Sequence, residues 1–237
     1  MAEAGTKQKV ILCLGGAFNP PHSRHVMAMV LGKQWLESNT NYQVVTGRLA
    51  VAPDGYVQTK SRKTGAKCMK AKHRIKLCEL ACCEQRDWLA PYHRPVGSAA
   101  ECGEKTRLEM LKETGKSEDL HVAVIIGADR AMNKSGYAKW HKEFKHITVC
   151  IGRKGETARI LERYEKDKDS GSIKHKQFCL IPDELDNVSS TSVRQVLAKM
   201  EGSESDKEQV MDTLINDGWL IKSQMLYILE NESDLYF

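Results

Sequence analysis

Two histidines and one arginine in this chain have the types and spacing to handle a phosphate chain. His22 and His25 lie three residues apart in the segment 16–25, GAFNPPHSRH. Residues three apart share one face of a helix, so two imidazoles at this spacing can bind the same anion. Arg194 closes the run 189–194, SSTSVR, and a forked guanidinium suits phosphate oxygens. Both segments predict anion binding, although histidines at a helix start can also be simple capping residues.

The histidine segment follows a pattern of strand, tight turn and helix. The apolar run 10–14 ends at a Gly-Gly pair, which is typical of a buried strand entering a turn. Two prolines delay a helix until about His22, and apolar residues at helical spacing follow from Val26 to Leu36. His22 and His25 therefore fall in or next to the first turn of the helix after the first strand. In an open α/β sheet, phosphates bind at this position.

The arginine segment also opens a helix, predicted over 191–200. Hydroxyl residues at a helix start leave backbone N–H groups exposed, and these can form an anion nest. We expect Ser190, Thr191, Ser192 and Val193 to offer such groups, with Arg194 one turn further in. The alternative is an ordinary serine N-cap followed by a surface arginine.

A third segment follows the apolar run 122–126, which is typical of a central parallel strand. Gly127 would let a ligand approach the backbone, and Asp129 could accept hydrogen bonds from ribose hydroxyls. A plain helix N-cap is the alternative. Trp140 could stack on a base or pyridine ring, or it could be a core residue.

The remaining pattern alternates strands with helices, which predicts a doubly wound, mostly parallel α/β sheet of Rossmann-like type with C-terminal helices. We expect one domain over 1–237, with a flexible N-terminus at 1–8 and a C-terminal helical part at 191–237. The expected strands cover 10–14, 42–51, 122–126, 146–151 and 177–181, with a brief one within 88–96. The expected helices cover 71–84, 99–113, 156–168, 191–200, 207–216 and 223–229. A turn is expected at 53–55, and a loop in the first half of the basic run 60–74.

Composition narrows the classes of function. The formal net charge is +5, and aromatic residues make up 6% of the chain. A nucleic-acid binder would need a basic face with aromatic residues, so we expect polyanionic small molecules instead. No stretch approaches the ~18 apolar residues of a membrane span. Eight cysteines without a C-x-x-C pair indicate reduced thiols, and the absence of a secretory leader pattern predicts an intracellular protein, cytoplasmic or nuclear.

Taken together, these motifs resemble the nicotinamide/nicotinic acid mononucleotide adenylyltransferases of the nucleotidyltransferase superfamily. That family has Gly-x-Phe-x-Pro-x-His/Thr-x-x-His after its first strand and Ser-Ser-Thr-x-x-Arg at a late helix, as at 16–25 and 189–194. It also has Gly-Ala-Asp followed by a tryptophan eleven residues later, which matches Asp129 and Trp140. The resemblance runs from about Val10 to Tyr227, and the pair His73-Arg74 is similar to the eukaryotic branch.

The resemblance implies adenylyl transfer from ATP to nicotinamide or nicotinic acid mononucleotide, giving NAD or its deamido form plus pyrophosphate. Magnesium or another divalent cation would accompany ATP, with no metal site built by the protein alone. His22, His25 and Arg194 would be catalytic. The implied phosphate contacts are Gly16, Ala17, Phe18, Ser190, Thr191, Ser192, Val193 and Arg194, with Lys60 as a weaker candidate. The implied nucleotide contacts are Gly127, Asp129, Lys139, Trp140, Arg153, Trp88 and Asp186.

Other functions stay open on the same residues. The scaffold could serve another adenylyl- or cytidylyltransferase with a different acceptor, or a non-catalytic dinucleotide-binding protein. A dehydrogenase is disfavoured because no Gly-x-Gly-x-x-Gly follows the first strand. Neither a nucleic-acid nor a membrane partner is expected, and the sequence is compatible with a homo-oligomer. It does not indicate whether the amide or the acid mononucleotide is preferred.

Overall fold

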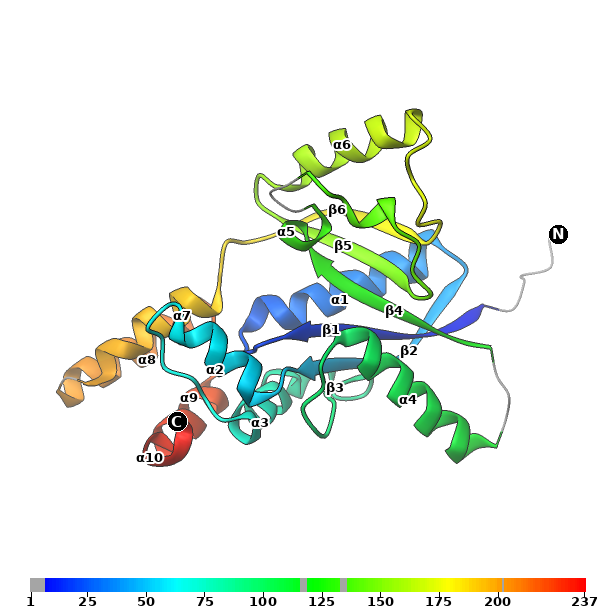
Figure 1. Ribbon diagram of the computed structural model, residues 1–237. Helices are drawn as coiled ribbons and strands as arrows, with labels where there is room; N and C mark the ends of the chain where they lie inside the picture. Colours follow the sequence, from blue (N-terminus) through cyan, green and yellow to red (C-terminus); the bar gives the residue numbers. More distant parts are fainter. Residues whose placement is uncertain (1–6, 116–118, 133–135, 202) are drawn as a thin grey trace. The chain divides into compact units, whose positions relative to one another are not determined.

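The computed structural model describes residues 7–115, 119–132, 136–201 and 203–237 (Figure 1). Residues 1–6 of the predicted flexible N-terminus lie outside the described residues. Six strands form one sheet in the order β3-β2-β1-β4-β5-β6. The pairs β1–β4, β4–β5 and β5–β6 are parallel. The predicted Rossmann-like α/β class with C-terminal helices is confirmed.

The elements follow the predicted alternation closely. The strands are β1 (Gln8–Gly16), β2 (Tyr42–Val51), β3 (Leu89–Pro91), β4 (Leu120–Gly127), β5 (Ile147–Arg153) and β6 (Phe178–Leu185). The helices are α1 (Ser23–Asn39), α2 (Asp54–Arg62), α3 (Ala71–Ala81), α4 (Ala99–Thr114), α5 (Ala128–Ala131), α6 (Thr157–Asp169), α7 (Ser190–Leu197), α8 (Glu204–Asn216), α9 (Lys222–Glu230) and α10 (Glu232–Leu235). Short 3₁₀ turns are η1 (Cys83–Gln85), η2 (Lys139–His141) and η3 (Ala198–Glu201).

The chain forms two compact units, and each is built from three separate segments. The first unit comprises the described residues up to Leu14 together with 28–48 and 99–186. The second comprises 15–27, 49–98 and 187–237. The expectation of a single domain over the whole chain stays a prediction.

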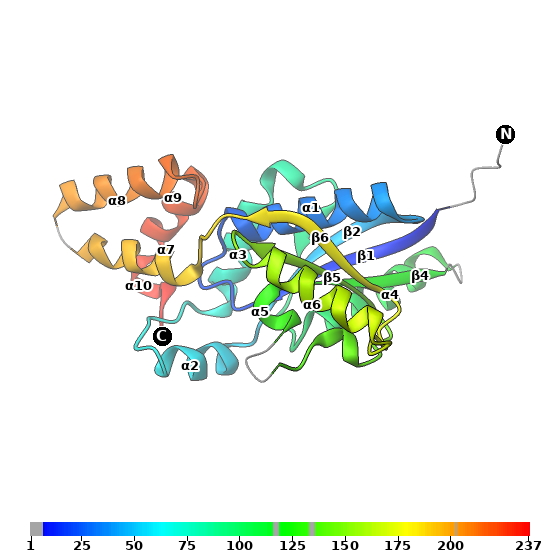
Figure 2. The same ribbon diagram turned by 90° about the horizontal axis from the view of Figure 1, so that it is seen from above.

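In the first unit, helices cover both faces of the sheet. A methyl group added at Gly32 of α1 would meet Ile125 and Leu12, whereas one added at Gly103 of α4 would meet Val122. Successive strand residues point to opposite faces, and Leu12 and Val122 have opposite parity in the β1–β4 register. Therefore α1 and α4 lie on opposite faces, and the absence of a side chain at each glycine lets the helix approach closely. Figure 2 shows α1 along one side of these strands and α6 along the other.

The second unit has its own apolar core, to which the C-terminal helices contribute. Buried residues of α3, α7, α8, α9 and α10 form one cluster, centred on side chains such as Leu77, Val193, Leu214 and Ile228. This cluster holds α7 in place, and α7 carries Arg194. The position of the arginine thus depends on the helices that follow α7 and on α3, which is far from it in the sequence.

One local prediction is wrong. The expected turn at 53–55 and part of the expected basic loop are instead α2, which runs from Asp54 to Arg62. Asp54 lies in its first turn, and Lys60 and Arg62 lie in its last. Charges of these signs stabilise the two ends of the helix dipole. The basic run therefore begins on a helix, and the expected loop is confined to residues 63–68.

Two compositional expectations can also be compared with the structure. All eight cysteines are free thiols, as predicted. Within the described ranges, no helix combines the length and the apolar character needed to cross a bilayer.

Candidate active site

The two histidines lie where the sequence predicts them, at the start of α1. His22 directly precedes the helix and His25 lies in its first turn. The backbone N–H of His22 donates to Nδ1 of His25 at 3.1 Å, and the ring centroids are 3.9 Å apart. The pair therefore forms a single unit, held by a local hydrogen bond and by ring contact.

This hydrogen bond fixes the form of the His25 ring. Because Nδ1 accepts a hydrogen bond from the backbone N–H of His22, a neutral imidazole must carry its proton on Nε2. Nε2 then becomes a hydrogen-bond donor, which is the role that a phosphate oxygen requires. The local backbone thus prepares His25 as a donor before any ligand binds.

His22 differs from the prediction. Its side chain is only 3% exposed, which leaves almost no surface for a nucleotide. In the described conformation, the predicted catalytic contact of His22 with the triphosphate is therefore replaced by support for the His25 ring. His25 itself is half-buried and retains a solvent-facing surface.

The loop before the histidines is bent at Phe18, whose φ of 47° lies in the left-handed region. This conformation is unfavourable for a bulky residue and persists only where surrounding contacts hold it. The Phe18 ring is buried and lies edge-on to His25, with centroids 4.8 Å apart. Because its side chain is buried, Phe18 could contact a nucleotide only through its backbone. The predicted ATP contacts of Gly16 and Ala17 would use backbone groups as well.

The start of α7 is capped by the protein itself. The Ser189 side chain accepts from the N–H of Ser192, and the N–H of Val193 donates to the Ser189 carbonyl. The Val193 side chain lies in the apolar core. The prediction that the amides of Ser192 and Val193 form an open anion nest is therefore wrong, because both are already bonded within the helix.

Two other α7 side chains contact residues 17–22, the segment between β1 and α1 that is called the histidine loop below. The Ser190 hydroxyl donates to the carbonyl of Pro20 at 2.9 Å. The Arg194 guanidinium donates to the carbonyl of Asn19 at 2.6 Å and to the Thr191 hydroxyl at 3.1 Å. The arginine and the histidine loop, which the sequence separates widely, are therefore in direct contact.

Arg194 is a half-buried cation whose partners are neutral oxygens. Burial lowers the pKa of Arg194 from its usual value, although a guanidinium stays charged at neutral pH. Among the described residues, no carboxylate pairs with it. A cation that has lost part of its hydration without gaining a counter-charge would be stabilised by a bound anion.

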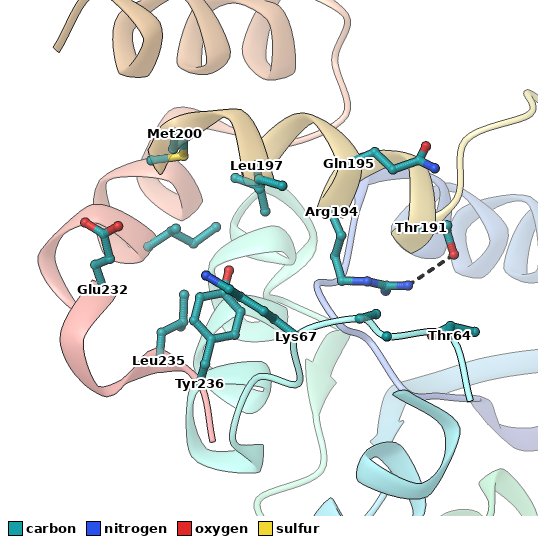
Figure 3. Close-up of a pocket in the computed structure, with 14 residues that line it drawn as sticks. Thr64, Lys67, Thr191, Arg194, Gln195, Leu197, Met200, Glu232, Leu235 and Tyr236 are labelled. Atoms are coloured by element: carbon teal, nitrogen blue, oxygen red, sulfur yellow. Dashed lines mark hydrogen bonds between the residues drawn. The ribbon is translucent and has the colours of Figure 1, made fainter. Parts of the chain in front are cut away.

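A cavity of about 400 Å³ lies beside Arg194 in the second unit (Figure 3). Arg194, Thr191 and Lys67 form its polar side, and Leu197 and Leu235 belong to its apolar side. Figure 3 shows the Arg194 side chain turned toward Thr191. This volume falls in the range of small-molecule sites, so the polar side is large enough for a phosphate group.

Two further predicted residues belong to the same unit. Lys60 is exposed on the last turn of α2. Trp88 is half-buried, and its indole N–H donates to the Gln85 side chain at 3.0 Å. Their predicted contacts with phosphate and pyridine stay predictions.

The other predicted contacts gather in the first unit, at the carboxyl ends of neighbouring strands. Gly127 ends β4, Arg153 ends β5, and Asp186 directly follows β6. The register pairs Gly127 with Ile151 and Arg153 with Leu185, so these ends lie side by side. This is the edge at which a parallel sheet binds ligands. Asp186 pairs with Lys154 at 2.9 Å, and its contact with a nucleotide stays a prediction, as does that of Arg153.

Gly127 is required for space rather than for backbone freedom. Its φ of −76° is open to any residue. A Cβ at this position, however, would lie 2.6 Å from Oδ1 of Asp129. The Asp129 carboxylate therefore folds over Gly127, which leaves the role of this aspartate toward a ribose a prediction.

Trp140 is a core residue, so the prediction that it stacks on a ligand is wrong for this conformation. Its side chain is 0% exposed and packs edge-on against Tyr164 and Phe178. The indole N–H donates to Asp167 at 2.8 Å. A ring covered on all sides has no face for a pyridine. Lys139, next to it, is half-buried with its ammonium over the Phe144 ring, and its ligand contact stays a prediction.

The sequence patterns assign no role to Asn19 or Arg74, whose contacts tie the histidine loop to residues 67–74. The Asn19 side chain donates to the Lys67 carbonyl and accepts from the Met69 N–H, both at 2.9 Å. Arg74 donates to the Ala17 carbonyl at 2.7 Å. A signal for Arg74 was present, because it shares a helix face with Leu77 and Cys78, and an arginine on an apolar face needs partners.

Known proteins resemble this chain in part of the sequence and in the fold. No family model matches the chain. A rice (Oryza sativa subsp. japonica) nicotinamide/nicotinic acid mononucleotide adenylyltransferase is 36% identical over 80 residues, which is 34% of this chain. The match spans 29% of the length of the rice protein.

Two solved structures of the Plasmodium falciparum nicotinic acid mononucleotide adenylyltransferase match almost the whole chain. The one complexed with APC covers 95% of this chain and 96% of that one, with a TM-score of 0.55 and 16% identity. The one complexed with NaAD covers 96% and 98%, with the same TM-score and identity. The chain has the fold of that enzyme. The resemblance predicted from the motifs is thus confirmed in part of the sequence and in the fold.

Proposed function

We propose that this chain is a nicotinamide/nicotinic acid mononucleotide adenylyltransferase, which joins ATP to a pyridine mononucleotide and releases pyrophosphate. The observation that carries the proposal is the contact of Arg194 with the loop that presents His25. In this proposal the Arg194 guanidinium and Nε2 of His25, each in the first turns of a helix, bind the same polyanion. The resemblance in fold and in sequence to enzymes of this name supports the choice of substrates.

The proposed reaction is an in-line displacement at the α-phosphorus of ATP. A 5′-phosphate oxygen of the mononucleotide forms the new P–O bond. The bond from the α-phosphorus to the α–β bridging oxygen breaks, and pyrophosphate leaves with the electron pair. Because no covalent enzyme intermediate is needed, catalysis rests on positioning and on stabilising charge at the phosphate oxygens.

Each residue has a defined part in this proposal. His25 donates from Nε2 to an oxygen near the α-phosphate, and His22 holds the His25 ring in place. Arg194 and the Thr191 hydroxyl bind the β- and γ-phosphates, with Lys60 as a further phosphate contact. Gly16, Ala17 and Phe18 offer backbone groups to the nucleotide.

The remaining predicted residues are proposed as nucleotide contacts within their own units. We assign Gly127, Asp129, Lys139, Arg153 and Asp186 to the nucleotide, on the strand ends where parallel sheets bind ligands. With Trp140 in the core, Trp88 becomes the stacking candidate for the pyridine ring.

A divalent cation would enter with ATP, bound to its phosphates, and would neutralise charge on the leaving pyrophosphate. The described residues contain no group of three or more His, Cys, Asp or Glu side chains arranged to hold a metal ion. Phosphate oxygens and water would then be the main ligands, which suits Mg²⁺ because it retains several waters in its sites. We propose no protein cage for the metal.

Two other functions fit the same fold. A different phosphate acceptor would give another adenylyl- or cytidylyltransferase, and a protein without turnover would be a dinucleotide-binding module. The donor form of His25 and the half-buried Arg194 favour catalysis over simple binding. We further propose an intracellular location, cytoplasmic or nuclear. The preference for the amide or the acid is decided by assay.

The test is a direct assay of the purified chain. ATP and Mg²⁺ are supplied with nicotinamide mononucleotide, nicotinic acid mononucleotide or phosphopantetheine in separate arms, and CTP replaces ATP in a fourth. Pyrophosphate release and dinucleotide formation are followed together. Dinucleotide formation in a pyridine arm supports the proposal. Turnover only with phosphopantetheine or CTP, or ATP binding without turnover in any arm, contradicts it.

A further inference from the structure

Arg74 is a fully buried cation that the proposed chemistry does not use. Its side chain is 0% exposed and lies on α3 among Ala71, Leu77 and Cys78. An ion taken out of water costs several kcal/mol unless its hydrogen bonds are met. The contacts of Arg74 therefore indicate why a guanidinium, rather than an apolar side chain, occupies this position.

The guanidinium makes three hydrogen bonds to three separate segments. Nε donates to the Met69 carbonyl at 2.9 Å. One terminal nitrogen donates to the Ala17 carbonyl at 2.7 Å, and the other to the Asp54 carboxylate at 2.7 Å. Only a rigid fork with several donors can meet three acceptors in different directions, and a lysine ammonium on a flexible stem lacks this geometry.

Each of the three acceptors lies next to, or is hydrogen-bonded to, a segment that carries a proposed substrate contact. Ala17 precedes Phe18, whose left-handed backbone and buried ring lie against His25. Asp54 opens α2, which carries Lys60 in its last turn. The Met69 N–H donates to the Asn19 side chain, and the Asn19 carbonyl accepts from Arg194. One buried side chain thus joins the histidine loop, α2 and the segment before α3.

Accordingly, we propose that Arg74 is a positioning residue for adenylyl transfer, which fixes the Ala17–Phe18 backbone and through it the ring of His25. This inference rests on the proposed function. A buried ion pair adds little net stability over apolar packing, so a role in specifying one conformation explains it better than a role in stability. Strain at Phe18 makes such an anchor necessary, because the loop would otherwise relax.

The experiment compares three variants of the full chain. Arg74→Lys keeps the charge and loses the fork. Asp54→Asn weakens one of the three bonds and leaves the two to carbonyls intact. Ile147→Ala, at the amino end of β5 in the first unit, lowers stability through a core outside the unit that contains Arg74 and the loop, and it serves as the control matched for loss of melting temperature. Displacement of a catalytic group by about 1 Å costs on the order of 10²-fold in rate.

We expect kcat per folded molecule to fall by about 10- to 100-fold in Arg74→Lys, to fall less in Asp54→Asn, and to stay at the wild-type value in Ile147→Ala. The KM of the mononucleotide should change little in all three. Wild-type kcat per folded molecule in both Arg74→Lys and Asp54→Asn would overturn the inference. Should Arg74→Lys not fold, the result for Asp54→Asn decides in the same way.

A second readout does not depend on turnover. The ¹⁵N chemical shifts of the His25 ring report which nitrogen carries the proton. We expect the Nε2–H form in the wild type and in Ile147→Ala, and a mixture of both forms in Arg74→Lys. An unchanged His25 spectrum in a folded Arg74→Lys protein would overturn the positioning role. If the wild type forms no dinucleotide while Arg74→Lys shows this spectral change, the proposed function alone is refuted.

Discussion

The guanidinium of Arg194 donates to the carbonyl oxygen of Asn19 at 2.6 Å, across 175 residues of sequence. Asn19 lies three residues before His22, so the late arginine contacts the loop that presents the histidines. Arg194 also has a neutral partner in Thr191 and lines the cavity of Figure 3. The same side chain can therefore hold the loop and attract an anion, and these two roles can be separated by mutation.

Replacing Arg194 by alanine should weaken the handling of ATP more than it weakens folding. A hydrogen bond to a charged group contributes about 1.5–3 kcal/mol, so the KM for ATP should rise about 10- to 100-fold. Steady-state kinetics at varied ATP and pyrophosphate measure this change. Ser190→Ala is the matched control, because Ser190 also ties α7 to this loop but carries no charge. An equal rise of KM in both variants would mean that only the tie to the loop matters.

Variants of His25 should separate its two ring nitrogens. An asparagine can accept from the His22 N–H, as Nδ1 does at 3.1 Å, but it has no donor at the place of Nε2. A glutamine can supply that distant donor. Loss of a donor aimed at a reacting group costs about 10²–10³ in rate, so His25→Asn should lose most turnover and His25→Gln should retain more.

The kinetic measurement for His25 is kcat at saturating substrates, with melting temperature recorded alongside. His93→Ala removes an exposed histidine elsewhere in the same unit and serves as the control. Near-wild-type turnover in His25→Asn would remove His25 from the catalytic role.

The predictions from sequence succeed where local pattern decides the structure. The strand at 42–51 matches β2, and the Pro-Pro pair correctly places the start of α1 after His22. Short-range spacing also places Gly127, Arg153 and Asp186 at strand ends, because parallel strands finish at one edge of the sheet.

They fail where a contact distant in sequence decides the structure. Trp140 has the spacing of a ligand contact, but Asp167 accepts from its indole, and two aromatic rings cover its faces. The anion nest fails because Ser189 caps its own helix. The partners of Arg74 lie 5, 20 and 57 residues away, so no local sequence pattern predicts its contacts.

Replacing Trp140 by phenylalanine should lower stability and leave turnover unchanged. The variant loses the hydrogen bond from the indole to Asp167 at 2.8 Å, and a bond to a charged group contributes about 1.5–3 kcal/mol. The Asp167 carboxylate keeps its bonds with His141 and Arg163. Denaturant unfolding measures this loss. Trp88→Phe is the comparison, because Trp88 is half-buried and should change the KM of the mononucleotide instead. A raised KM in Trp140→Phe below its unfolding transition would return Trp140 to the ligand site.

The last prediction concerns acid stability at Asp234. Its carboxylate accepts from Lys70 and Lys72 and lies 3.2 Å from Nε2 of His73, and these hydrogen bonds, those of the lysines first, hold the pKa of Asp234 well below its usual range. A depressed pKa in the folded state means that this stabilisation is present above the unfolded pKa of about 3.9 and is lost as the pH falls below it. The melting temperature of the wild type should therefore fall more steeply than that of Asp234→Asn as the pH drops from about 4 to about 2. The control is Asp212→Asn, which replaces an exposed aspartate on α8 and should leave the dependence of melting temperature on pH as in the wild type. Equal dependence on pH in all three proteins would refute the role of Asp234.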